Sequence, residues 1–174
     1  MLRGLGLFEA PAAGAGPGAG HADALSLSFN QDGSRLAIGT RDGFRVYGLQ
    51  PFARHFVSRA GGQRLAEVMG WSNLVCLVGA GEAPALSPRC LRLYDLHARK
   101  VLTEVSFAAA VTRVVLNRSR LAAACPGAVY VFDLSTMECL RALDLAAEAA
   151  ADASTPDAGA TAAAAAAAAA LDRK

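Results

Sequence analysis

Apolar and polar residues alternate from Leu25 to Phe29, where leucine or phenylalanine takes every other position and serine the positions between. This period of two predicts a half-buried β-strand. The run Asn-Gln-Asp-Gly that follows at 30–33 has the composition of a tight turn, because aspartate can bond its own backbone and glycine accepts a positive φ. A second apolar run, an Asp-Gly turn at 42–43 and a third run complete a meander of three strands.

The same pattern returns twice along the chain. The segment RVYGL at 45–49 is echoed by RLYDL at 92–96 and YVFDL at 130–134, so an aromatic residue recurs at Tyr47, Tyr94 and Phe132. Each repeat can be divided into four strands: 25–29, 35–39, 43–48 and 53–58; then 65–71, 74–79, 90–95 and 101–106; then 111–116, 120–125, 128–133 and 138–143.

Four antiparallel strands recurring at this interval are typical of a β-propeller blade. A β-sandwich of short strands would also place turns at such spacings, but it does not predict a returning aromatic position. The sequence therefore favours an all-β fold, a partial WD-repeat-like β-propeller with about three four-stranded blades.

The composition divides the chain into three parts. Residues 1–23 are rich in Gly, Ala and Pro and are expected to be disordered. Residues 24–145 hold the three blades, at about 24–60, 63–107 and 110–145. Residues 146–174 form an alanine-rich tail, interrupted by Pro156 and Gly159, that is expected to be disordered or partly helical, with a short helix over 161–172.

Charge and cysteine content exclude several classes of protein. The formal net charge is only +2 at pH 7, and nothing in the sequence indicates a nucleic acid or a small-molecule substrate as a partner. The four cysteines form no CxxC pair, so no zinc site is expected, and they lie in apolar runs where a thiol acts as a small hydrophobe. No cofactor is indicated. No convincing signal peptide or membrane-spanning stretch is present, which favours a reducing cytosol.

No catalytic constellation emerges either, and the chain is not expected to be an enzyme. The histidines are scattered, and the segment GWSNL at 70–74 resembles a nucleophile elbow without its last glycine, so it is better interpreted as a hairpin turn. Asp95 and Asp133 occupy equivalent positions in two repeats, which indicates that they accept backbone hydrogen bonds in turns.

Two arginines are the candidate site residues. Arg118 and Arg120 flank a short turn in the segment LNRSRL at 116–121, where an arginine fork could bind a carboxylate of a partner. The alternative is an ordinary solvated turn with no binding role.

These motifs resemble the PROPPIN (WIPI-type) family of seven-bladed propellers. Residues 28–32, 36–40 and Gly43 match the pattern S-F-N-Q-D-x-x-x-L-A-I-G-T-x-x-G of the family's first blade, and residues 116–121 match its L-N-R-x-R-L turn. The resemblance covers about residues 25–145. It implies a chain that corresponds to the N-terminal part of such a propeller, with about three of seven blades.

The resemblance also implies a role in autophagy. The family binds phosphatidylinositol 3-phosphate and the 3,5-bisphosphate, and recruits autophagy proteins to autophagosomal membranes; a member would be cytoplasmic and peripheral at phagophore, autophagosome or endosomal membranes. Arg118 and Arg120 would then contact protein partners.

The family's lipid-binding Arg-Arg-Gly motif has no counterpart here, because the sequence contains no Arg-Arg pair, and no lipid-binding residue is assigned. The alternatives are a protein-interaction WD-repeat scaffold without lipid binding, and a truncated gene model.

Overall fold

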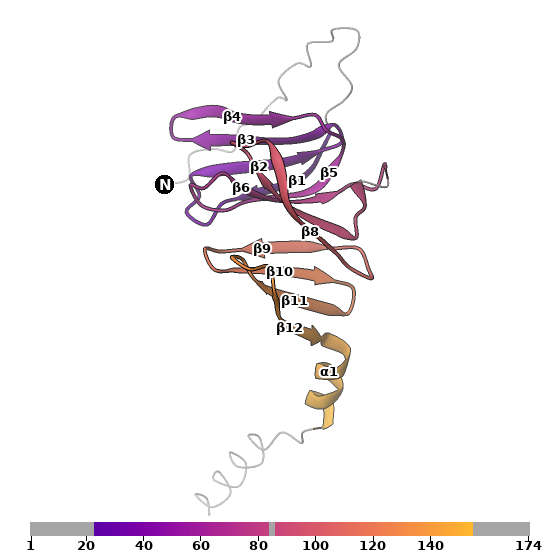
Figure 1. The fold of residues 1–174 in the computed structure, drawn as a ribbon. Coiled ribbons are helices and arrows are strands. Elements are labelled where there is room, and N and C mark those ends of the chain that lie inside the picture. The colour runs from indigo at the N-terminus through magenta and orange to yellow at the C-terminus, as the bar shows by residue number, and fades with distance from the viewer. Residues whose placement is uncertain (1–22, 84–85, 155–174) are drawn as a thin grey trace, which may run out of the picture.

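Three four-stranded antiparallel sheets make up most of the molecule (Figure 1). The computed structural model describes residues 23–83 and 86–154; the expectations for residues 1–22 and for a helix over 161–172 lie outside them. We call the sheets blades 1, 2 and 3. Blade 1 contains β1 (Ala24–Phe29), β2 (Arg35–Thr40), β3 (Gly43–Leu49) and β4 (Phe52–Ser58); blade 2 contains β5 (Gln63–Val68), β6 (Leu74–Gly79), β7 (Cys90–Asp95) and β8 (Lys100–Ser106); blade 3 contains β9 (Arg113–Leu116), β10 (Arg120–Cys125), β11 (Ala128–Asp133) and β12 (Cys139–Asp144).

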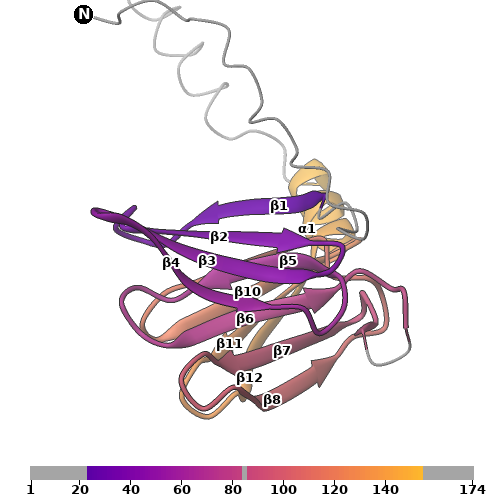
Figure 2. The same ribbon diagram turned by 90° about the horizontal axis from the view of Figure 1, so that it is seen from above.

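Within each blade the strands pair in chain order, so each blade is a simple meander. Figure 2 shows this order for β1 to β4, and Figure 1 shows it for β9 to β12. The blades follow one another in space in the order of the chain, with blade 2 in the middle (Figure 1). Their first strands β1, β5 and β9 are neighbours and form the inner edge of the stack. The predicted partial β-propeller is confirmed.

Two hydrophobic cores hold the blades together. One contains Phe44 and Val46 of blade 1 against Val68, Val75 and Leu77 of blade 2. The other lies between blades 2 and 3; it contains Cys76, Val78, Leu91, Leu93, Val111, Val114, Leu116, Leu121, Ala123, Cys125 and Phe132. Because β6 contributes to both cores, it is buried on both faces, and its sequence LVCLV is apolar without interruption.

The recurring aromatic residues stand beside a recurring irregularity. The pairing of the third strand with the fourth shifts register immediately before Tyr47, Tyr94 and Phe132, once in each blade. Such a bulge strengthens the local twist of a sheet. Tyr94 packs against blade 1, with its ring centre 5.6 Å from that of Phe44, and Phe132 belongs to the core between blades 2 and 3.

A helix, α1 (Leu145–Ser154), follows β12 directly. The Asp144 carboxylate accepts hydrogen bonds from the backbone N–H groups of Ala146 (3.0 Å) and Ala147 (3.2 Å), which is the geometry of a helix N-cap. The helix lies in the alanine-rich segment that was expected to be disordered or partly helical. In the described parts of the chain, no helix has the length and hydrophobicity needed to cross a bilayer.

Candidate interaction surface at the turns of the inner strands

Three hairpin turns, one from each blade, meet at one end of the inner edge. They are the β1–β2 turn (residues 30–34), the β5–β6 turn (69–73) and the β9–β10 turn (117–119). Between them lies a groove of about 480 Å³, which we call the turn groove. Its lining includes Asp32, Met69, Trp71, Ser72, Asn117 and Arg118. The surface therefore exists only when three blades are packed together.

Arg118 lies at the exposed tip of the β9–β10 turn and lines the turn groove. The turn is held by Asn117, whose Oδ1 accepts hydrogen bonds from the backbone N–H groups of Ser119 (2.9 Å) and Arg120 (2.8 Å). Within residues 23–83 and 86–154, no carboxylate lies within ion-pair distance of the Arg118 guanidinium. A cation on a fixed turn is thus left available to a ligand.

Arg120 is placed differently. Its Nη1 lies 2.6 Å from Oδ2 of Asp133 and also donates to the carbonyl of Ser119 (2.9 Å). The pKa of Asp133 is held below its usual value, chiefly by the Ser135 hydroxyl and then by the Ser135 backbone, with a smaller effect of Arg120. Arg120 therefore ties β10 to the end of β11, and it does not line the turn groove. The two arginines that were proposed together have different surroundings.

The turn aspartates behave as the repeats predict. Asp95 Oδ1 accepts the backbone N–H groups of His97 (2.7 Å) and Ala98 (3.0 Å), and Asp133 Oδ1 accepts that of Ser135 (2.9 Å). Ser72, in the segment that resembled a nucleophile elbow, donates to the carbonyl of Met69 (2.7 Å) inside the β5–β6 hairpin turn. Both structural interpretations are confirmed.

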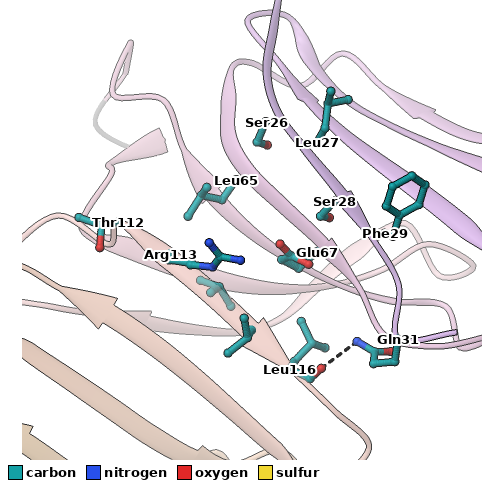
Figure 3. Close-up of a pocket in the computed structure, with 12 residues that line it drawn as sticks. Ser26, Leu27, Ser28, Phe29, Gln31, Leu65, Glu67, Thr112, Arg113 and Leu116 are labelled. Carbon is teal, nitrogen blue, oxygen red and sulfur yellow. Dashed lines mark hydrogen bonds between the residues drawn. The ribbon is translucent and has the colours of Figure 1, made fainter. Parts of the chain in front are cut away.

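Gln31 is a residue that the sequence analysis did not single out. Its Oε1 accepts the backbone N–H of Gly70 in blade 2 (2.6 Å), and its Nε2 donates to the carbonyl of Leu116 in blade 3 (2.7 Å; Figure 3). One side chain of blade 1 thus connects to both other blades. Its only signal in the sequence is its place in the matched run 28–32, since the two partners are 39 and 85 residues away.

A second cavity, of about 570 Å³, runs along the inner strands β1, β5 and β9 (Figure 3). Glu67 points into it, and burial raises the pKa of this carboxyl, opposed by the Ser28 hydroxyl and the charge of Arg113. Propellers have a channel at this position between their inner strands. In the described ranges, no group of three His, Cys, Asp or Glu side chains is placed to hold a metal ion.

Comparison with known proteins identifies relatives by sequence. Autophagy-related protein 18 of Kluyveromyces lactis is 35% identical over 118 residues, which is 68% of this chain and 24% of the relative. The protein of the same name from Mycosarcoma maydis is 35% identical over 123 residues, 69% of this chain and 27% of the relative. The chain therefore spans about a quarter of the length of these curated relatives. No family model matches the sequence.

Solved structures show the same fold. Kluyveromyces marxianus Hsv2 superposes with a TM-score of 0.64 at 17% identity, over 71% of this chain and 40% of that one. KlAtg21, in its complex with the coiled coil of AgAtg16, superposes with a TM-score of 0.61 at 22% identity, over 72% of this chain and 41% of that one. The fold is shared with Hsv2 and KlAtg21. Because its sequence is also similar to that of autophagy-related protein 18, the chain belongs to the PROPPIN family of autophagy-related β-propellers.

Proposed function

We propose that this chain is a non-enzymatic autophagy propeller segment that recruits a protein partner through the turn groove, with Arg118 binding a carboxylate of that partner. The observation that carries the proposal is the Arg118 side chain, exposed on a fixed turn and lining a groove built by three blades. A guanidinium in this setting forms charge-assisted hydrogen bonds to a carboxylate with good geometric specificity.

A coiled-coil partner fits this chemistry. KlAtg21 forms a complex with the coiled coil of AgAtg16, which shows that a protein of this fold can take such a ligand. Coiled coils present charged side chains, often glutamate, beside their apolar seam, so a helix of this kind offers a carboxylate next to apolar atoms. In this proposal the chain is cytoplasmic and peripheral at phagophore, autophagosome or endosomal membranes.

Partner recruitment, rather than phosphoinositide binding, is assigned to these residues. The family resemblance connects lipid binding with an Arg-Arg-Gly motif, and the sequence contains no Arg-Arg pair. The competing activity is direct binding of the chain to phosphatidylinositol 3-phosphate, and it can be measured separately.

The test is titration calorimetry of the full chain with the coiled coil of AgAtg16. We expect Arg118→Glu to weaken binding by about tenfold or more, because it puts a like charge against the partner's carboxylate. Arg89→Glu is the matched control, since Arg89 is exposed in the loop between β6 and β7, does not line the turn groove and undergoes the same charge change.

Equal affinities of the Arg118 and Arg89 variants would contradict the assignment to Arg118. Vesicles that contain phosphatidylinositol 3-phosphate provide the second arm. Co-sedimentation of the chain with these vesicles, but not with vesicles of phosphatidylcholine alone, would favour phosphoinositide binding over the scaffold role.

A further inference from the structure

Trp71 is the only tryptophan of the chain, and its side chain is 65% exposed. It lies on the β5–β6 turn of the middle blade, with Asp32 of blade 1 and Arg118 of blade 3 lining the same groove. An exposed indole is a large apolar surface left in water. Tryptophan and arginine are the residue types most enriched among side chains that dominate protein–protein binding energy.

The indole is held in place by its neighbours. The Arg35 guanidinium lies over the Trp71 ring, 5.3 Å from the ring centre, and Nη1 of Arg35 donates to the carbonyl of Ser72 (2.8 Å). Arg35 thereby fixes both the ring and the turn that carries it. A side chain ordered before binding loses less conformational entropy when a partner packs against it.

Gln31 fixes the relative positions of the three turns. Its hydrogen bonds to Gly70 and Leu116 reach the residue before Trp71 and the residue before the β9–β10 turn. Asn30 adds a bond from its Nδ2 to the carbonyl of Gly70 (3.1 Å). The spacing between Trp71 in blade 2 and Arg118 in blade 3 is therefore set by a side chain of blade 1, Gln31.

Side chains of opposite charge line the groove. Arg118 on the blade 3 turn is a cation with no ion-pair partner among residues 23–83 and 86–154, and Asp32 on the blade 1 turn is a carboxylate. The pKa of Asp32 lies below its usual value, chiefly because the Ser34 hydroxyl donates to the carboxylate, so Asp32 is ionised at neutral pH. A carboxylate of a ligand would be attracted at Arg118 and repelled at Asp32, so the two charges favour one position for that carboxylate in the groove.

We propose that Trp71 is the central apolar contact of the turn groove, for a helical partner segment that packs an apolar side chain on the indole and presents a carboxylate to Arg118. Gln31 is a positioning residue that holds the Trp71 and Arg118 turns at the spacing this segment requires. The inference rests on the proposed partner recruitment and adds to it the chemistry of the partner surface.

The experiment uses the single tryptophan as its own reporter, in the full chain titrated with the coiled coil of AgAtg16. We expect the emission of Trp71 to shift to shorter wavelength and its quenching by iodide to fall as the partner covers the ring. Trp71→Ala should weaken binding measured by calorimetry about 10- to 100-fold. Phe52→Ala is the matched control, because Phe52 is an aromatic residue with 71% exposure that does not line the groove.

Gln31 is tested by a variant with a second readout. Gln31→Leu should weaken binding of the coiled coil. The second readout is the midpoint of urea unfolding, measured in parallel for the variant and the unmodified chain. Combination with Trp71→Ala should add little further loss of affinity, since a positioning residue acts through the residue it positions. Additive losses in the double variant would contradict the positioning role.

The outcomes separate the two proposals. If binding depends on Arg118 but the Trp71 emission does not change and Trp71→Ala binds normally, the Trp71 contact is wrong and partner recruitment stands. If the unmodified chain shows no binding to the coiled coil, the proposed function fails, and the Trp71 inference fails with it.

Discussion

At the scale of single residues, the four cysteines differ sharply in accessibility. All are free thiols; Cys76, Cys90 and Cys125 are buried, and Cys139 on β12 is exposed. Burial raises the pKa of the Cys76 thiol and, as the main cause, raises that of Cys90 to about 11. The thiolate is the reactive form of cysteine, so these buried groups should be inert in the folded state.

We therefore expect Ellman's reagent at pH 8 to label one thiol rapidly in the native chain and all four in urea. Cys139→Ser should remove the rapid reaction and leave three thiols that react only after unfolding. Rapid labelling of two or more thiols in the native chain would show that a core between blades opens easily.

Candidate site residues could be named from the sequence only where the signal is local. Arg118 and Arg120 were visible as arginines in a turn motif, yet nothing in the motif shows that Asp133 neutralises one of them. Gln31 and Trp71 could not be assigned, because their neighbours in the groove come from other blades. Proximity between residues far apart in the chain depends on how the blades pack.

At the scale of the elements, the prediction from sequence was more complete. The alternation of apolar and polar residues, with turns that contain glycine, predicted twelve strands close to those observed. The threefold sequence repeat predicted that these strands group in fours. The uninterrupted apolar run of β6 fits its place in the middle blade, since a strand buried on both faces needs no polar side. The run does not identify that place by itself, because β10 of blade 3 is also apolar from Leu121 to Cys125.

The β11–β12 turn provides a test at this scale. Asp133 accepts hydrogen bonds from Ser135 and forms an ion pair with Arg120. These interactions stabilise the ionised form of the Asp133 carboxyl group. We expect Asp133→Asn to lower the midpoint of urea unfolding at pH 7. Glu138→Gln, which changes charge in the same turn region without this set of bonds, is the control.

The pH dependence follows from the direction of the shift. The pKa of Asp133 is lower in the folded chain than in the unfolded one, so its contribution is complete above the unfolded value of about 4 and is lost as the pH falls through the folded value. The difference between the native chain and Asp133→Asn should therefore disappear in strongly acidic solution. A difference that stays constant from pH 7 down to pH 2 would contradict the electrostatic explanation.

At the scale of the whole molecule, the three blades are not equally covered. Leu27 and Phe29 on β1 are 65% and 64% exposed. The register of the sheets places Ala66 and Val68 of blade 2 at the corresponding positions, and these are buried against blade 1. Similarly, Tyr94 packs on the preceding blade, whereas its counterpart Tyr47 stacks on Phe52 of its own sheet, with ring centres 5.5 Å apart. Blade 1 thus has an apolar face that corresponds to the face by which blade 2 packs on blade 1. In the described part of the chain, no blade packs against this face of blade 1.

A contiguous apolar face of this kind favours association, and contact between two different faces can propagate from copy to copy. We expect light scattering of the isolated chain to show assembly that increases with concentration. Substituting Leu27→Ser together with Phe29→Ser should reduce this assembly with little change in the urea midpoint, because both side chains are already exposed. Val101→Ser with Leu102→Ser, two exposed apolar residues on β8 of the middle blade, should leave the assembly unchanged. A chain that stays monomeric at every concentration and unfolds in one cooperative transition would show instead that three blades form a complete folding unit, and that the bare face of blade 1 is tolerated in water.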